Sequence, residues 1–204
     1  MAVSETHRIE KRDRITEAAI SVFAEKGYTS ARVADVARKA GVADGTIYLY
    51  FRNKEDLLLS IFEEKMGMLL DELADALDGI DDPLERVRVY AKQHFQQLRD
   101  NPELAQVFQV ELRQSHRFLR EYRPEKLWDY LNVFASAIED GKRAGHFRAD
   151  VDPFIAKWAF FGALDELSIQ WVLARKRDRF DLDGAATQVV EMFLRGITTT
   201  GPKE

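Results

Sequence analysis

Residues 41–54 read Gly-Val-Ala-Asp-Gly-Thr-Ile-Tyr-Leu-Tyr-Phe-Arg-Asn-Lys and predict a sharp turn followed by one short helix over 44–51. Ile47 and Phe51 are four residues apart, so they share an apolar face of that helix. Polar and cationic side chains lie outside this face or follow it: Thr46, Tyr48, Tyr50, Arg52 and Lys54. Hydroxyls and cations on a short exposed helix suit phosphates and base edges. A short surface helix with an ordinary aromatic content is the alternative interpretation.

Two further helices precede this stretch. Apolar residues recur at helical spacing over 8–26 and again over 31–40. Gly27 and Gly41 follow these segments at the position where a left-handed C-terminal residue is expected. The second segment, the turn at Gly41 and the helix over 44–51 form a helix-turn-helix pattern. With the first helix, the sequence predicts a three-helix core.

A long helix is predicted to begin at Asn53. The Asn53 side chain can cap it, and Asp56 stands three residues on, which is close to a capping box. One apolar stripe continues over 54–79, in Leu57, Leu58, Ile61, Phe62, Met66, Leu69, Leu70, Leu73 and Leu77. About 25 residues make about 40 Å of helix. Such a helix can link the helix-turn-helix mechanically to the rest of the chain, and it can also be an ordinary core helix.

The remaining chain is also read as helical. Start signals with Pro at the first helical position occur at Asp82-Pro83, Asn101-Pro102 and Asp152-Pro153. Pro124 marks a further helix start or a kink, and the last helix is predicted over 181–197. About nine helices and no convincing strand predict an all-α fold. We expect a helix-turn-helix domain over 1–53 and a ligand-binding and dimerisation domain over 54–204.

Residues 153–173 are apolar on more than one face, which indicates a helix buried on several sides. In a chain of this size the second buried face predicts a subunit interface. The helices over about 153–176 and 181–197 would then pair across a two-fold axis as a four-helix bundle in a homodimer. The alternative is a central core helix of a monomer. Lys157, Asp165 and Glu166 argue against a membrane span.

Charge and composition narrow the function classes. The net charge is −5, but residues 1–52 carry +2 and the remainder −7. A mildly basic N-terminal part can still bind DNA locally, because phosphate contacts are short-range at physiological salt. The chain has no cysteine, which fits a reducing compartment, and its polar N-terminus does not read as a signal peptide, so a cytoplasmic location is expected.

No catalytic constellation stands out in the sequence. There is no His-x-x-x-His pair, no P-loop and no glycine-rich dinucleotide turn. We therefore expect neither an enzyme nor a metal site nor a cofactor.

These motifs resemble those of the TetR family of transcriptional repressors. The resemblance covers residues 8–60 and rests on Gly27-Tyr28, on Val33-Ala34-Asp35-Val36-Ala37, on residues 40–51 and on Asn53-Lys54-Glu55-Asp56-Leu57-Leu58. It implies a dimer that binds a palindromic double-stranded DNA operator. By the same resemblance Gly45 would approach the backbone closely, Thr46, Tyr50 and Lys54 would meet phosphates, and Asp44, Tyr48 and Leu49 would face the major groove.

Two departures from the family pattern concern helix caps. Members of the family usually have Ser where Ala43 stands, and Thr or Ser where Ala31 and Arg32 stand. A lost cap costs on the order of 1 kcal/mol. Asp44 or Ser30 are expected to take over capping, and Arg32 could reach a phosphate that the hydroxyl would have met.

Within this family the chain resembles the fatty-acid-degradation regulators of the FadR type, on residues 42–51, Glu64-Lys65-Met66-Gly67 and Glu111-Leu112-Arg113-Gln114-Ser115. The resemblance implies release from the operators of fatty-acid-degradation genes by long-chain acyl-CoA as effector. A regulator that answers another apolar molecule, such as a drug or a free fatty acid, is the alternative.

An acyl-CoA effector needs an apolar tunnel with cations at its mouth. The candidate apolar residues are Phe95, Leu98, Val107, Phe108, Leu112, Phe134, Trp158 and Phe161, and plain core packing is the alternative for each. Arg113, Arg117 and Arg120 would form one cationic helical face for the CoA phosphates. A solvated surface is the alternative for these arginines. His94 is expected to be a core histidine with its hydrogen bonds satisfied.

Overall fold

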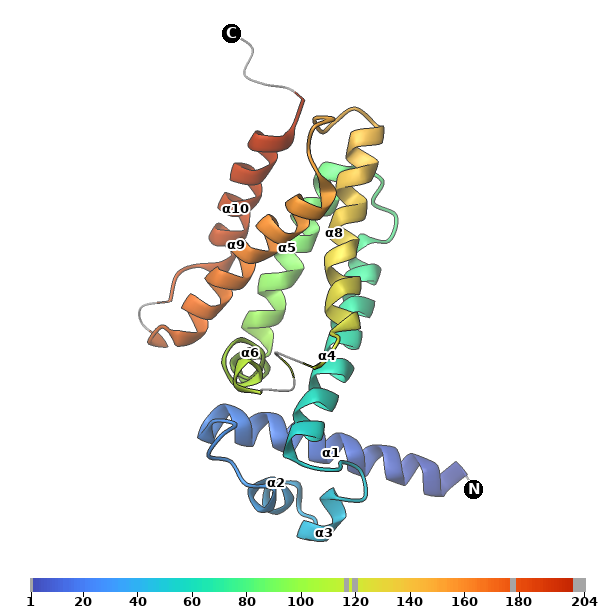
Figure 1. The fold of residues 1–204 in the computed structure, drawn as a ribbon, viewed down its shortest axis with the longest axis vertical. Coiled ribbons are helices and arrows are strands. Elements are labelled where there is room, and N and C mark those ends of the chain that lie inside the picture. Colours follow the sequence, from blue (N-terminus) through green and yellow to red (C-terminus); the bar gives the residue numbers. More distant parts are fainter. Residues whose placement is uncertain (1, 116–117, 119–120, 177–178, 200–204) are drawn as a thin grey trace. The chain divides into compact units, whose positions relative to one another are not determined.

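The structure is a computed structural model that describes residues 2–115, 118, 121–176 and 179–199. Over these residues the chain forms nine α-helices, one π-helical turn (η1) and one 3₁₀ turn (η2), which confirms the all-α prediction. The elements in chain order are α1 (Ala2–Lys26), α2 (Val33–Ala40), α3 (Asp44–Ile47), α4 (Lys54–Leu77), α5 (Pro83–Asp100), α6 (Pro102–Gln106), η1 (Val107–Glu111), η2 (Leu112–Gln114), α8 (Glu125–Arg143), α9 (Pro153–Leu173) and α10 (Leu182–Ile197) (Figure 1).

The chain divides into two compact units. The head unit consists of Met1–Lys65 and Pro102–Arg123, and the body unit of Met66–Asn101 and Pro124–Glu204. The segment 102–123 thus joins the N-terminal helices although it is distant from them in sequence. The domain division between residues 53 and 54 stays a prediction.

In the head unit α1 packs against α2, α6 and η1. The apolar row predicted on the first helix is buried: Ile15, Ala18, Ala19, Val22 and Phe23. α2 ends at Gly41, whose φ of +66° lies in the left-handed region and suits glycine. The backbone N–H of Val42 then donates to the carbonyl of Ala37 at 3.0 Å and closes the turn.

Three predicted helix bounds in the head unit need correction. α1 already begins at Ala2, whereas the apolar pattern becomes visible only from residue 8. α2 begins at Val33 rather than at residue 31. α3 ends at Ile47 rather than at residue 51, and the chain continues in tighter turns in which Leu49 and Tyr50 donate to carbonyls three residues back. These turns carry Phe51 into the core, where it is 2% exposed.

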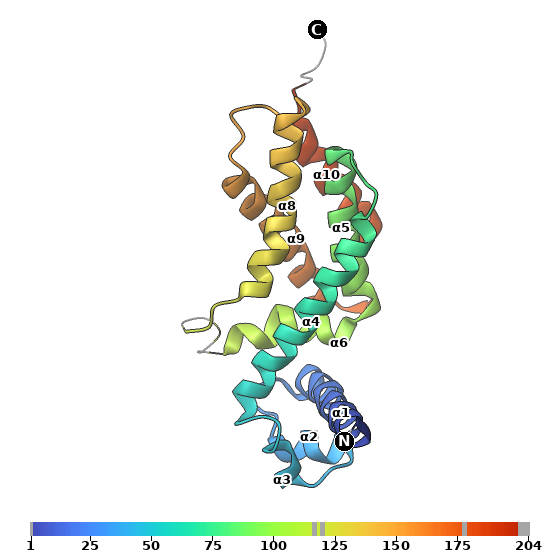
Figure 2. The same cartoon turned by 90° about the vertical axis from the view of Figure 1, so that its right-hand side faces the viewer.

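The body unit is a bundle in which α5 lies beside α8, α9 and α10 (Figure 2). Its centre is aromatic: the rings of Phe134 and Phe160 stack with centroids 4.4 Å apart, and Phe193 packs against both. An isolated antiparallel bridge joins Phe147 to Thr198. The Phe147 ring lies so close to Gly141 that a Cβ atom there would fall 2.1 Å from it, so only glycine fits.

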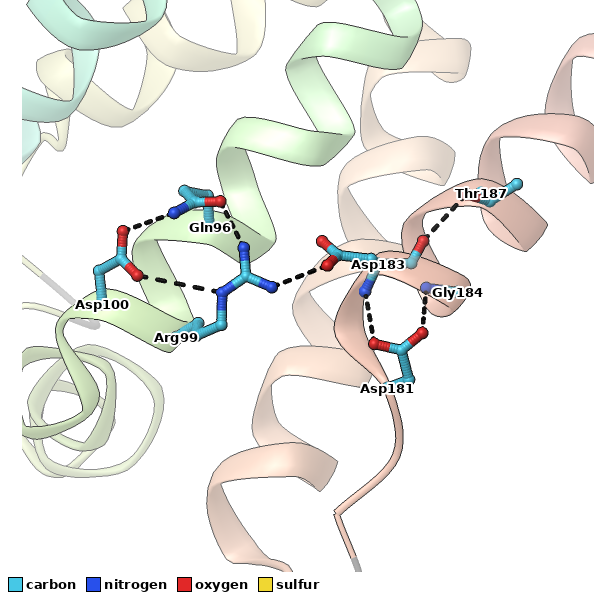
Figure 3. Close-up of polar contacts among 7 residues, drawn as sticks. All are labelled: Gln96, Arg99, Asp100, Asp181, Asp183, Gly184 and Thr187. Atoms are coloured by element: carbon cyan, nitrogen blue, oxygen red, sulfur yellow. Dashed lines mark hydrogen bonds and ion pairs between the residues drawn. The ribbon is translucent and has the colours of Figure 1, made fainter.

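Helix starts in the body unit follow the sequence signals. The carboxylates of Asp82 and Asp152 accept from the backbone N–H groups two residues on, at 3.0 and 2.8 Å, with Pro in the first helical position. α10 is capped by Asp181, which accepts from Gly184 at 2.8 Å. Figure 3 shows how α5 is tied to this cap: Arg99 donates to the Asp183 carboxylate at 2.9 Å.

Candidate DNA interface and effector site

The surface around α3 carries the side chains predicted to meet DNA. Tyr48 is 56% exposed and Leu49 81%, while Ile47 and Phe51 are buried. Asp44 and Gly45 are also exposed, and Thr46 and Tyr50 are half-buried. Two large side chains this open to water would be unfavourable without a partner, and a groove lined by base edges and methyl groups suits them. Their DNA contacts stay a prediction.

Asp35, the third residue of α2, bonds back to the start of the helix. Its carboxylate accepts from the backbone N–H of Arg32 at 3.2 Å and pairs with Lys26 at 3.0 Å. The hydrogen bond from Lys26, together with that from the Arg32 backbone, lowers the pKa of this carboxyl. Ser30, the expected substitute, does not cap α2, whose N-cap residue is Arg32. Ala31 is buried, and the exposed Arg32 side chain remains a candidate for a phosphate.

The start of α3 has no side-chain cap. Ala43 occupies the N-cap position, and its methyl side chain cannot accept a hydrogen bond. The expectation that Asp44 compensates is not met, because Asp44 is the first helical residue itself. A four-residue helix without a cap is held by its neighbours rather than by its own hydrogen bonds.

Lys54 has partners that the sequence did not suggest. Its ammonium donates to the carbonyl oxygens of Tyr28, Thr29 and Ala31 at 2.6, 3.2 and 3.0 Å. It also lies 4.5 Å from the centre of the Tyr28 ring. Burial lowers the pKa of this ammonium. Since three donors meet three carbonyls, the predicted phosphate contact would require Lys54 to give up bonds within the protein.

The start of α4 is a modified capping box. Asn53 accepts from the backbone N–H of Asp56 at 2.8 Å, as expected for a cap. The Asp56 carboxylate accepts from the backbone N–H of Arg52 at 2.9 Å, one residue earlier than in the usual box. The two bonds fix where α3 and its turns join the long helix.

The candidate effector residues fall in both units. Val107, Phe108, Leu112 and Arg113 belong to the head unit, and Phe95, Leu98, Phe134, Trp158 and Phe161 to the body unit. In the head unit Val107 and Leu112 are buried, and Phe108 packs against Phe62 with ring centroids 5.2 Å apart. In the body unit Phe95, Leu98 and Phe134 are buried, while Trp158 is 41% exposed. Their contact with an effector stays a prediction.

The predicted cationic face is not one helix. The helical segment ends at Gln114, and Ser115 has extended backbone with ψ of 118°. Arg113 is exposed and donates to Gln109 at 3.3 Å. Arg117 and Arg120 lie outside the described residues. The spacing argument for a single arginine row therefore fails, because it assumed an uninterrupted α-helix.

A buried polar chain crosses three helices of the body unit. Ser168 donates to the carbonyl of Leu164 at 2.9 Å, so the Ser168 oxygen accepts from His94 Nε2 at 3.1 Å. His94 Nδ1 then accepts from the Tyr130 hydroxyl at 2.9 Å. Burial lowers the pKa of His94 to about 4 and raises that of Tyr130. His94 is thus neutral at physiological pH with both ring nitrogens bonded, as expected for a core histidine.

α9 and α10 expose apolar side chains that the body unit leaves uncovered. Ile155 is 65% exposed, Phe154 63% and Leu173 61% on α9, and Met192 is 75% exposed on α10. Small residues lie between them on the exposed side of α9, namely Ala159, Gly162 and Ala163. Apolar helices with small residues on the open side allow close packing of a second pair of helices. The predicted homodimer would use this surface.

Sequence reasoning missed the role of Glu111, Gln114 and Ser115. Glu111 is 4% exposed and accepts from the backbone N–H of Tyr28 at 2.6 Å. Thr29 donates to Gln114 at 2.8 Å, and Ser115 donates to Glu55 at 2.6 Å. In the sequence these residues carried only a family resemblance. A carboxylate in a helical pattern normally indicates a solvated surface, so nothing marked Glu111 as buried.

No group of three or more His, Cys, Asp or Glu side chains among the described residues could hold a metal ion. None of the helices described is both long and apolar enough to span a bilayer.

Comparison with known proteins decides the family. Residues 15–61 match the family model described as "Bacterial regulatory proteins, tetR family", and residues 62–196 match "YsiA-like protein, C-terminal region". The "Fatty acid metabolism regulator protein" of Bacillus subtilis is 38% identical, over 90% of this chain and 94% of that protein. The chain belongs to the tetR family of bacterial regulatory proteins.

Two solved structures resemble this tetR-family regulator over nearly its whole length. FadR from Bacillus halodurans, a fatty acid degradation regulator, shares 42% identity with a TM-score of 0.84, over 91% of this chain and 95% of that one. FadR from Bacillus subtilis, solved in complex with stearoyl-CoA, shares 38% identity with a TM-score of 0.83, over 90% and 98%. The resemblances stated from the sequence are confirmed, and the relatives are regulators rather than enzymes.

Proposed function

We propose that this tetR-family regulator is a transcriptional repressor of fatty-acid-degradation genes that binds a palindromic operator as a homodimer and is released by long-chain acyl-CoA. The observation that carries the proposal is the fold match to FadR with stearoyl-CoA, together with the exposed Tyr48 and Leu49 beside a helix-turn-helix. A cytoplasmic location is part of the proposal, because operator and acyl-CoA meet there.

DNA recognition is assigned to the surface around α3. Tyr48 and Leu49, with Asp44, face the major groove, because they are the open side chains of that surface. Gly45 lets the backbone approach DNA, and the hydroxyls of Thr46 and Tyr50 bond phosphates. Arg32 at the start of α2 adds a further phosphate contact. One such surface per subunit enters successive major grooves about 34–36 Å apart.

Dimerisation is assigned to the apolar faces of α9 and α10. Ile155, Leu173 and Met192 lie on surface that a partner copy would cover. A dimer is required by the proposal, because a single short helix contacts too few base pairs for specific binding. The domain over 54–204 then carries both the dimer interface and effector binding, and 1–53 carries DNA binding.

The effector follows from the chemistry of a long-chain thioester. Its acyl chain needs apolar surroundings, which the candidate aromatic and aliphatic residues offer in both units. The effector can release DNA only to the extent that it binds the released state more tightly. Of the three candidate arginines, Arg113 lies within the residues that the structure describes, and we assign it to a CoA phosphate.

The proposal is tested by fluorescence anisotropy on a labelled operator. Stearoyl-CoA should weaken binding by at least about tenfold, while free CoA should leave it unchanged. Stearate alone separates the two candidate effectors, because it carries the same chain without the nucleotide. Unchanged affinity with acyl-CoA of every chain length would remove the acyl-CoA claim, and release by stearate or by a drug would support the alternative effector class.

A further inference from the structure

The turn over 27–31 connects the first two helices of the DNA-binding surface, and the head unit holds it from two directions. Lys54, at the start of α4, donates to the carbonyls of Tyr28, Thr29 and Ala31. Glu111 accepts from the backbone N–H of Tyr28 at 2.6 Å. The N–H and the C=O of one residue are thus fixed by side chains from two different segments.

Glu111 is a buried carboxylate surrounded by hydrogen-bond donors, unlike a carboxylate on the surface. It is 4% exposed and also accepts from Gln114 at 2.9 Å and from Gln106 at 3.3 Å. Its oxygen lies 3.6 Å from the position of a Cβ atom at Gly27, where φ is +78°. Three donors therefore converge on one buried carboxylate beside a left-handed glycine.

Neighbouring bonds tie the same segment to the same part of the head. Thr29 donates to Gln114 at 2.8 Å, and Ser115, which is buried, donates to Glu55 at 2.6 Å. Together these bonds form a clamp that we define as Glu111, Gln114 and Ser115. The clamp contacts the turn before α2 and the first turn of α4, which adjoin the DNA-binding surface.

The segment that carries the clamp is locally unusual. Val107–Glu111 is a π-helical turn, which holds about one residue more than an α-helix over the same path. Conversion to α-helix would rotate the residues after it by about 100°, since each residue of an α-helix turns by that angle. Such a rotation would take Glu111 away from the Tyr28 N–H. Two discrete arrangements of one short element can couple sites.

The π turn also carries candidate effector contacts. Val107 and Phe108 lie in its first half, and Glu111 is its last residue. An effector that packs against Val107 or Phe108 would act on the same turn that positions Glu111. No displacement of a larger element is needed for the clamp to respond.

We propose that Glu111, Gln114 and Ser115 are positioning residues that hold the turn over 27–31 in its DNA-binding arrangement, and that effector binding at the π turn withdraws them. This inference rests on the proposed function for the identity of the effector. It assigns the transmission of the signal to named hydrogen bonds within the head unit.

The test compares variants that differ in one hydrogen bond. Glu111→Gln keeps an oxygen that can accept from Tyr28, whereas Glu111→Leu removes it. Gln114→Ala is a second, milder variant at an exposed position, in case Glu111→Leu does not fold. Glu25→Gln, an exposed change on α1, is the matched control. Each is checked by circular dichroism and then titrated with operator, with and without stearoyl-CoA.

We expect Glu111→Leu to weaken effector-free operator binding by about fivefold or more, and stearoyl-CoA to retain less than about a third of its wild-type effect. Gln114→Ala should show the same loss of effector response to a smaller degree. Glu111→Gln should fall between wild type and Glu111→Leu, because it keeps one acceptor oxygen for Tyr28 but places an NH2 group where the other carboxylate oxygen stood. Glu25→Gln should behave like wild type. A folded Glu111→Leu protein that binds operator more weakly but responds fully to stearoyl-CoA would show a structural role only and overturn the proposal.

Hydrogen exchange of the Tyr28 amide separates this inference from the proposed function. We expect slow exchange in the free protein, and exchange at least about tenfold faster with stearoyl-CoA or in Glu111→Leu. If stearoyl-CoA neither binds nor releases operator, the proposed function fails, and the clamp still stands if the Leu variant alone speeds Tyr28 exchange and weakens operator binding. If effector releases operator while Tyr28 exchange stays unchanged, the proposed function stands and the clamp is wrong.

Discussion

The side-chain ammonium of Lys54 donates to the main-chain carbonyl oxygen of Tyr28 at 2.6 Å and lies 4.5 Å from the centre of the Tyr28 ring. The first residue of α4 is therefore bound to the turn that precedes α2. This contact fixes the start of α4 on the turn through backbone carbonyl oxygens, which any residue type can offer. Its geometry explains why a lysine stands here: a single ammonium can satisfy three carbonyls at once.

Lys54→Met should lower the free energy of unfolding by about 1–2 kcal/mol, because three carbonyls lose their donor while the aliphatic part of the side chain is kept. Urea denaturation measures this loss. If Lys54 acts only within the protein, the variant's salt dependence of operator binding should match that of wild type. A slope reduced by about one unit in log K against log salt, with unchanged stability, would instead establish the predicted phosphate contact.

Tyr48→Ala should weaken operator binding about tenfold or more without lowering the thermal midpoint, since the side chain is exposed and one base contact is worth about 1–3 kcal/mol. Fluorescence anisotropy on operator and on unrelated DNA measures both affinity and specificity. Tyr48→Phe keeps the ring and serves as the control that isolates the hydroxyl. Wild-type affinity for Tyr48→Ala would mean that the surface around α3 does not recognise the operator.

Parts of this molecule could be read from its sequence because they depend on local chemistry. The helix starts at Asp82 and Asp152 and the left-handed turn at Gly41 follow from residue type and position alone. The apolar row on α1 was equally clear, because helical spacing leaves few other arrangements for it. The exposed apolar faces of α9 and α10 came from the same pattern.

Other parts depend on tertiary contacts that no periodicity records. Nothing in the sequence marked Glu111 as buried, because its partner, the backbone N–H of Tyr28, lies 83 residues away along the chain. The arginine row was based on an uninterrupted helical count, which the extended backbone at Ser115 breaks. The family resemblance implied a phosphate contact for Lys54, and no pattern in the sequence indicated its three carbonyl partners.

The pKa of His94 gives a prediction of how the free energy of unfolding changes at acid pH. Its pKa is lowered from 6.5 to about 4 by burial, so between these values the unfolded chain binds a proton that the folded chain does not. The contribution is therefore complete above about pH 6.5 and is lost as the pH falls towards 4, to a total of about 3 kcal/mol. Urea denaturation as a function of pH measures it. His94→Gln should flatten the profile in this range, and a His94→Gln profile as steep as that of wild type would contradict the assignment.

The exposed faces of α9 and α10 give a prediction about assembly. Ile155→Arg and Met192→Arg each place a charge on surface that is 65% and 75% exposed in one chain, so neither should disturb the fold of the subunit. In a dimer the same charges would be buried without a partner, which costs several kcal/mol per subunit. We therefore expect dimer by sedimentation velocity for wild type, monomer for both variants, and loss of operator binding with unchanged helicity. Glu139→Arg, an exposed change on α8, should remain dimeric. Dimers in both α9 and α10 variants would place the interface on another face of the body unit, since one charge per helix is enough to separate surfaces that pack closely.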